Sequence, residues 1–270
     1  MKTLKRIYTL FYLLVLFGFA SCSANLSLKA QNDGSVKTDF TADMGAYLSQ
    51  ALEGISANMG GGKDIINAAS LKKAFTGSDF TGVSANVPNK QTVIVSGTIV
   101  PLKQQKTFKG VKTSSFVKCE DNKLTLTLSP ALLQGFYNSM GQDDRTYLDL
   151  FMAPIFTGEK MTQTEYKELV ASVYGQELAD DMQKGKIVIK LTVPDGKSIK
   201  KSGAKIGQSK PSKNSKCLSF SIPMLEFLTL QTEKTAFISW SCRSMKACFH
   251  QGLYFYIRKR CLCVTPYRTS

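Results

Sequence analysis

The fold prediction rests on residues 26–40, LSLKAQNDGSVKTDF. Apolar residues alternate with polar ones on both sides of the turn cluster 32–35: Leu26, Leu28 and Ala30 before it, and Val36, Thr38 and Phe40 after it. Alternation with a period of two around an Asp-Gly pair is typical of a β-hairpin that buries one face. We therefore predict two antiparallel strands joined at Asp33 and Gly34.

The segment before this hairpin resembles an export signal. Residues 1–6 are basic, residues 7–19 form an uncharged, mainly apolar run of 13 residues, and the small residues Ala20 and Ser21 precede Cys22. This is the layout of a secretory signal peptide, and the run is too short to span a bilayer. Residues 19–22, FASC, are similar to a bacterial lipobox. We predict a signal peptide over 1–21, lipidation of Cys22 and a tether over 22–25. Cleavage near Ala20 and an uncleaved anchor are the alternatives.

Net charge argues against a nucleic-acid partner. The chain carries a formal charge of +15, but the leader and residues 241–270 hold nine of the basic residues and no acid. The stretch between them, 23–240, has 26 Lys and Arg against 20 Asp and Glu. Because the excess lies mostly at the ends, the body lacks the basicity typical of nucleic-acid binding.

The rest of the body mixes both kinds of secondary structure. Apolar residues repeat at helical spacing over 44–59, 65–75, 130–140, 147–155 and 162–182, where residues 162–165 form a capping box. Strand patterns cover 80–87, 92–100, 115–119, 124–128, 186–193, 218–222 and 235–240. We predict one α+β domain over 26–240, a mostly antiparallel sheet of hairpins with about four amphipathic helices packed on one face.

The stretch 196–216 is the most basic part of the body. It holds no acid and seven lysines: Lys197, Lys200, Lys201, Lys205, Lys210, Lys213 and Lys216. Like charges without partners repel each other and remain in water, so we predict an exposed, mobile hairpin or loop. Such a loop would face a partner or the anionic headgroups of the anchoring membrane, or it would simply be solvated.

Residues 241–270 differ in character from the body. They have neither strand nor helix period, yet they contain four of the seven cysteines and the only histidine, His250. We predict that this tail is disordered or non-native and that the domain ends at Trp240. In the body, Cys119 and Cys217 could pair in an oxidising compartment or be two small buried residues.

Three of these features together allow a comparison with known families. They are the lipobox, the hairpin of 26–40, and a strand ending at Val193-Pro194-Asp195-Gly196 that precedes a last strand ending in Ile238-Ser239-Trp240. This combination resembles bacterial lipoproteins of unknown function, spirochaete-type ones included, and its last part is similar to the LppM-like lipoprotein domain. The resemblance implies an α+β surface domain without established chemistry, and it transfers no functional residue.

The sequence argues against common catalytic constellations. The body has no histidine, which excludes Ser-His-Asp and Cys-His catalysis there. Ser70-Leu-Lys-Lys73 matches Ser-x-x-Lys, but its companion motifs are missing. Gly60-Gly-Gly-Lys63-Asp64 lacks the spacing and the hydroxyl of a phosphate loop. Cysteines near His250 do not have the spacing of a zinc finger. We expect no enzyme, no metal and no cofactor.

Two functions of different class remain open. The first is a membrane-anchored envelope lipoprotein that acts as a structural or interaction module. The second is a carrier that holds an apolar or lipid ligand between the sheet and the helices, suggested by the aromatic residues of 147–156. Lipid that co-purifies with the protein, detected by mass spectrometry, would favour the carrier.

Overall fold

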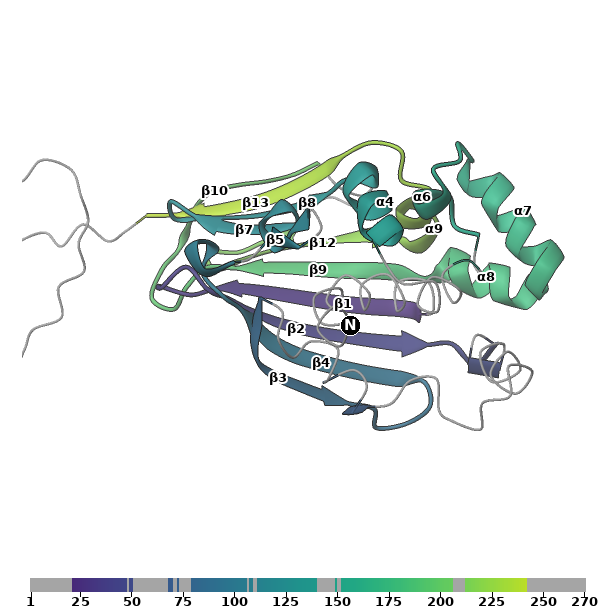
Figure 1. Ribbon diagram of the computed structural model, residues 1–270, viewed down its shortest axis with the longest axis horizontal. Coiled ribbons are helices and arrows are strands. Elements are labelled where there is room, and N and C mark those ends of the chain that lie inside the picture. The colour runs from purple at the N-terminus through teal and green to yellow at the C-terminus, as the bar shows by residue number, and fades with distance from the viewer. Residues whose placement is uncertain are drawn as a thin grey trace, which may run out of the picture.

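The computed structural model describes residues 21–47, 49–50, 68–69, 72, 79–105, 107–108, 111–139, 149, 152–205 and 212–241 (Figure 1). Residues 1–20 of the predicted leader, most of the predicted helices 44–59 and 65–75, and nearly all of the tail 241–270 lie outside these residues. The Ser70 and Gly60 motifs and His250 also lie outside them.

The larger of the two main sheets has seven strands. Their order is β11 (Ser212–Lys213), β12 (Cys217–Pro223), β9 (Lys186–Thr192), β1 (Ser21–Ala30), β2 (Val36–Met44), β4 (Thr92–Ile99) and β3 (Phe80–Asn86). Neighbouring strands are antiparallel except for β1 and β9, which are parallel. The hairpin predicted from residues 26–40 is the β1–β2 pair, so that prediction is confirmed.

The turn of this hairpin has the chemistry that its sequence suggests. Oδ1 of Asp33 accepts hydrogen bonds from the backbone N and Oγ of Ser35, at 2.9 and 2.7 Å. Gly34 has a φ of 85°, a left-handed conformation that glycine adopts without strain. The same hydrogen bonds hold the pKa of Asp33 below its ordinary value.

A second sheet has four strands and faces the first. Its order is β10 (Ile199–Ala204), β13 (Lys234–Trp240), β8 (Lys123–Leu128) and β7 (Val117–Glu120), all antiparallel. The chain connects β4 of the first sheet to β7 of the second through four short elements: η1 (Leu102–Gln104), β5 (Thr107–Phe108), β6 (Val111–Lys112) and η2 (Thr113–Ser115). After β9 the chain crosses between the sheets three times, because β10 and β13 belong to the small sheet whereas β11 and β12 belong to the large one.

The described helices gather at one end of the two sheets (Figure 1). They are α4 (Pro130–Ser139), α6 (Pro154–Thr157), α7 (Gln163–Tyr174), α8 (Gln176–Lys184) and α9 (Met224–Leu228). The predicted capping box is present: Thr162 Oγ1 accepts from Glu165 N at 3.2 Å, and Glu165 Oε2 accepts from Thr162 N at 2.7 Å. None of the described helices is long and apolar enough to cross a membrane.

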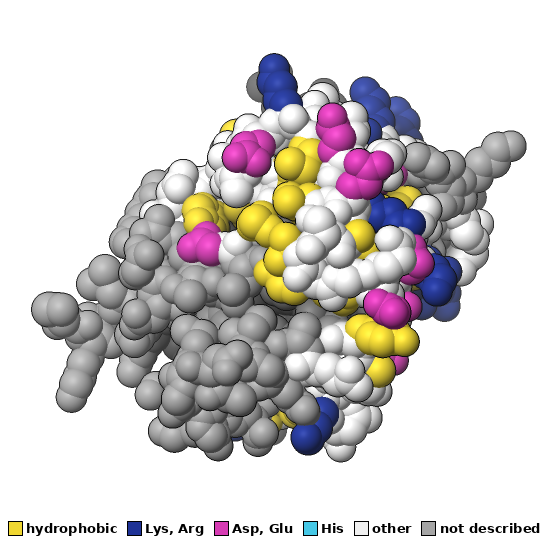
Figure 2. All heavy atoms as spheres, turned by 90° about the vertical axis from the view of Figure 1, so that its right-hand side faces the viewer, with side chains coloured by type: hydrophobic (Ala, Val, Ile, Leu, Met, Phe, Trp, Pro, Cys, Tyr) yellow, Lys and Arg dark blue, Asp and Glu magenta, His cyan; other side chains and the backbone are white. Residues whose placement is uncertain are grey.

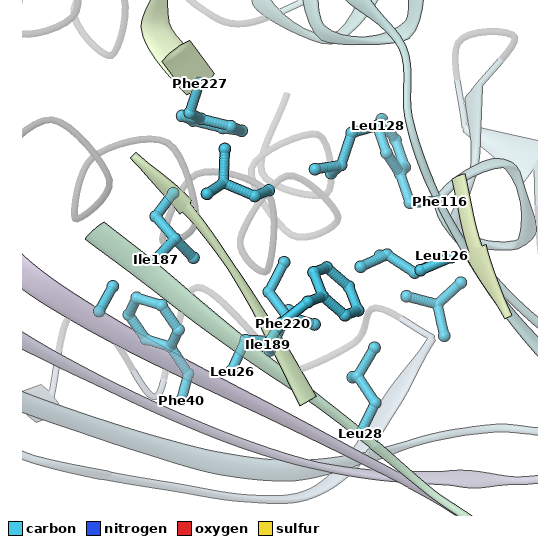
Figure 3. Packing of buried hydrophobic residues seen from close by; sticks show 14 of the residues in the cluster. Leu26, Leu28, Phe40, Phe116, Leu126, Leu128, Ile187, Ile189, Phe220 and Phe227 are labelled. Atoms are coloured by element: carbon cyan, nitrogen blue, oxygen red, sulfur yellow. The ribbon is translucent and has the colours of Figure 1, made fainter. Parts of the chain in front are cut away.

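One hydrophobic core lies between the two sheets and continues under the helices. Figure 3 shows Leu26, Ile189 and Phe220 of the large sheet directed toward Leu126 and Phe116. Phe227 of α9 extends the same core at the helical end. The α+β class is thus confirmed, with a second sheet in addition to the expected helices. That sheet can bury a face because alternate residues of β8 and β13 are apolar.

Candidate functional site

The first candidate surface is the end of the large sheet where β1 begins. Ser21 pairs with Met44, and Ser23 pairs with both Asp43 of β2 and Lys186 of β9, with a register shift between Ser21 and Ser23. Pro223, the last residue of β12, pairs with Lys186 in the same row. We call this end, defined by Ser21–Ser23, Met44, Lys186 and Pro223, the anchor end, because the predicted lipidation residue Cys22 lies in it.

The tether predicted over residues 22–25 is wrong. These residues belong to β1, and Ala24 is only 1% exposed. Ala24 continues the row of buried residues that includes Leu26 and Leu28. Because alanine has a low strand propensity, the alternating pattern in the sequence was recognised only from Leu26 onward. As a result, no linker separates Cys22 from the folded body.

Three large hydrophobic residues are exposed in the part of the chain that the structure describes, and two belong to segments at the anchor end. Tyr47, 48% exposed, follows Met44 by three residues, and Val173, 51% exposed, lies in the last turn of α7. The third, Ile94 at 36%, is paired with Thr41 on the outer face of the large sheet. Sequence periodicity had placed Val173 on the buried face of its helix, so this surface was missed.

The helices α7 and α8 form a hairpin that extends past the start of β1 (Figure 1). Gly175, with a φ of 98°, ends α7 and directly precedes α8. Lys167 of α7 binds Asp180 of α8 at 2.7 Å, and its Nζ also donates to Gln183. The hydrogen bond from Lys167 is the main reason that the pKa of Asp180 lies below its ordinary value. Asp180 is therefore part of a helix–helix contact, whereas the neighbouring Asp181 pairs with Lys184 of its own helix.

The second candidate surface lies at the opposite end of the strands. The parallel register runs from Ser23–Lys186 to Lys29–Thr192, which spans about 20 Å at the usual rise per residue. Beyond this row are the turn after β9 and the turn before β12. We call this end the basic end and define it by Lys197, Lys200, Lys201, Lys213 and Lys216.

Backbone hydrogen bonds connect the two turns of the basic end. Val193 N donates to Lys216 O at 3.0 Å, and Ile199 N donates to Ser215 O at 2.8 Å. The Asn214 carboxamide accepts from Lys216 N and Cys217 N, both at 2.8 Å. The predicted mobile loop is thus wrong for the described residues, which form β10, β11 and hydrogen-bonded turns, because the chain here crosses between two sheets.

The predicted lysines divide into three groups. Lys200, Lys201, Lys213 and Lys216 are exposed and Lys197 is half-buried, and all five lie at the basic end. Lys205 is exposed but follows the far end of β10, where its N donates to Thr235 O. Lys210 lies outside the described residues.

Asp195, which lies in the turn after β9, has its own partner. Asp195 accepts from Lys29 Nζ, with the closest N–O distance 2.7 Å, and this contact holds the pKa of Asp195 below its ordinary value. Lys29 comes from β1, 166 residues away along the chain, so no local sequence pattern indicated this pair. The Asp195 carboxylate is therefore paired with a lysine from outside the basic end.

The described residues show little that resembles reaction chemistry. Cys119 and Cys217 are buried free thiols, and no cluster of three or more metal-ligating side chains occurs among the residues described. Burial raises the pKa of Cys119 to about 11, which disfavours the reactive thiolate. Of the aromatic segment that suggested a carrier, Ile155 and Phe156 pack in the core, and Phe156 stacks on Tyr137 at 5.7 Å. Tyr147 lies outside the described residues.

Comparison with known proteins shows a distant structural similarity. No family model matches the chain, and no curated protein matches it. Among solved structures, the chain is similar to the folded domain of LppM from Mycobacterium tuberculosis, determined by NMR, with a TM-score of 0.34 and 6% identity. The similarity covers 83% of this chain and 93% of that one. A TM-score this low carries no argument about function, so both surfaces are interpreted from their own residues.

Proposed function

We propose that this chain is an exported lipoprotein, held to an envelope membrane by acyl chains on Cys22, whose body acts as an interaction module. The anchor is supported by the basic n-region, the apolar run and the small residues before Cys22. A diacylglyceryl group with a further amide-linked chain exceeds the two signals that stable anchoring requires.

The observation that carries the proposed role is the separation of the two ends of the large sheet. Cys22 lies at one end of β1, and Lys29 at the other end contacts Asp195 beside the basic end. The separation of about 20 Å exceeds the Debye length of about 8 Å at physiological ionic strength. With the anchor end at the membrane, the lysines of the basic end face away from the bilayer. Their partner is an acidic surface of another envelope protein.

The anchor is tested by changing Cys22→Ala in the full chain. The variant should move from the detergent phase to the aqueous phase and should no longer incorporate labelled palmitate. Cys119→Ala, a change at a buried thiol, is the matched control and should leave both properties unchanged. Palmitate labelling that persists in the Cys22→Ala protein would contradict the anchor.

The basic end is tested with two variants of equal net charge. One carries Lys200→Gln, Lys201→Gln and Lys213→Gln, and the other carries Lys160→Gln, Lys184→Gln and Lys186→Gln, three lysines that are also exposed but lie at the helical end. In-cell cross-linking should capture an acidic protein with the wild type and with the second variant, but not with the first. Equal capture by both variants would show that position does not matter, and would contradict a specific surface.

The same variants distinguish a protein partner from membrane headgroups. An unlipidated Cys22→Ala protein that binds anionic vesicles through Lys200, Lys201 and Lys213, with the salt dependence of charge attraction, would assign the basic end to the membrane. Such a result would replace the proposed protein partner. We expect no difference in vesicle binding between the two lysine variants.

A further inference from the structure

The anchor end places specific side chains close to the lipid. Because Cys22, the first residue after the predicted cleavage, lies in β1, an acyl chain on it holds the body against the bilayer without a spacer. Any part of the body that extends past the start of β1 must then reach the bilayer surface. Figure 1 shows that the α7–α8 hairpin extends in this direction, and residues 45–47 directly follow the end of β2 there.

The exposed apolar residues of these two segments fit such a contact. Val173 is 51% exposed in the last turn of α7, beside the Gly175 break, and Tyr47 is 48% exposed in the segment after β2. Figure 2, which looks at this side of the molecule, shows hydrophobic side chains open to the surface between acidic ones. Tyrosine prefers the headgroup level of a bilayer, where its ring is buried and its hydroxyl remains in water.

The distribution of charged residues indicates which kind of interaction stabilises this contact. Residues 159–184 contain six acids and three lysines, whereas residues 195–216 contain one acid and seven lysines. The helical segment 159–184 is therefore net negative, whereas the segment 195–216 is net positive. A net negative surface gains nothing from anionic headgroups, so apolar contact at the interface must stabilise this orientation.

We propose that Val173 of α7 and Tyr47 after β2 both rest in the interfacial layer of the bilayer that holds Cys22, with the basic end directed away from it. This surface is a membrane-docking face, and its partner is the lipid bilayer. The proposal rests on the anchor proposed above. It adds an orientation, which the anchor alone would leave free.

The single tryptophan of the chain provides an internal control. Trp240 pairs with Ile199, at the basic end, and is 7% exposed. Full-length lipidated protein is placed in phosphatidylcholine vesicles whose acyl chains are brominated, which quenches tryptophan within contact distance. Three proteins are compared: the wild type with Trp240, Trp240→Phe with Val173→Trp, and Trp240→Phe with Ile94→Trp.

The expected result is loss of fluorescence for Val173→Trp and unchanged fluorescence for Trp240. Quenching of Ile94→Trp instead of Val173→Trp would show that the outer face of the large sheet lies on the membrane, and would overturn the orientation. Fluorescence that is unchanged in all three proteins, while they float with the vesicles, would overturn the docking face and leave the anchor intact. Failure to float would overturn the anchor, and this inference with it. Tyr47→Trp in the Trp240→Phe background repeats the test if Val173→Trp does not fold.

Discussion

Gly203 on β10 lies directly opposite Phe237 on β13, and the ring covers the glycine so closely that a Cβ at position 203 would lie 2.8 Å from Cε1 of Phe237. On the neighbouring strand β8, Lys123 Nζ lies 4.6 Å from the centroid of the same ring. Phe237 therefore links three strands on the outer face of the small sheet. An aromatic ring over a cross-strand glycine is a known way to stabilise such a pair.

Gly203→Ala should destabilise the domain, because the added methyl group forces the Phe237 ring out of its position. We expect a loss of about 1–3 kcal/mol in the free energy of unfolding, measured by urea denaturation. Gly135→Ala is the control, since Gly135 lies in α4 and a Cβ there meets nothing within 4 Å. That change should stabilise the domain by about 0.5–1 kcal/mol. The same loss from both substitutions would contradict the role of Phe237.

Thr162→Ala should weaken the start of α7. It removes the side-chain acceptor of Glu165 N, and loss of such an N-cap costs about 0.5–2 kcal/mol. The measurement is thermal unfolding of the variant beside Thr162→Ser, which keeps the hydroxyl and should remain close to the wild type. If serine is as damaging as alanine, the cap hydrogen bond is not the cause.

Asp195 should titrate abnormally because of Lys29. Its lowered folded-state pKa means that the contact stabilises the protein above the ordinary aspartate pKa, and that this stabilisation is lost as the pH falls through the folded-state pKa. In Lys29→Met, the NMR-measured pKa of Asp195 should rise toward its ordinary value. Lys37→Met, which removes the lysine paired across from Lys29, is the control. An equal shift in both variants would point to net charge instead of the contact.

Cys119 should resist thiol reagents in the folded protein. With Cys22 and the four tail cysteines replaced by serine, only Cys119 and Cys217 remain. Because burial raises the pKa of Cys119 from 9.0 to about 11, we expect no maleimide reaction at pH 8, and rapid reaction once urea unfolds the chain. The sign of the shift also predicts that stability falls as the pH rises above 9, where the unfolded thiol ionises first. Rapid labelling of folded Cys119 at pH 8 would contradict its burial.

Local patterns determined many of the elements correctly. The alternation around Asp33 and Gly34 identified the β1–β2 hairpin, and residues 162–165 identified the start of α7. Both depend on side chains and backbone groups within a few residues of each other, which the order of residues alone specifies. The lysine cluster was also evident in the sequence. The sequence did not show that the segment carrying these lysines crosses between two sheets.

The sequence by itself determined an α+β domain, the candidate anchor at Cys22 and an unusually basic segment. Only the tertiary structure decided that β1 pairs in parallel with β9, which lies more than 150 residues away along the chain. That pairing places Lys186 beside Ser23 and Thr192 beside Lys29, and so separates the anchor end from the basic end. Such contacts depend on which apolar faces pack together, and strand periodicity shows that a face is apolar without showing what it meets. The exposure of Val173 was undetermined for the same reason, because helical spacing does not show how far a helix extends beyond the core.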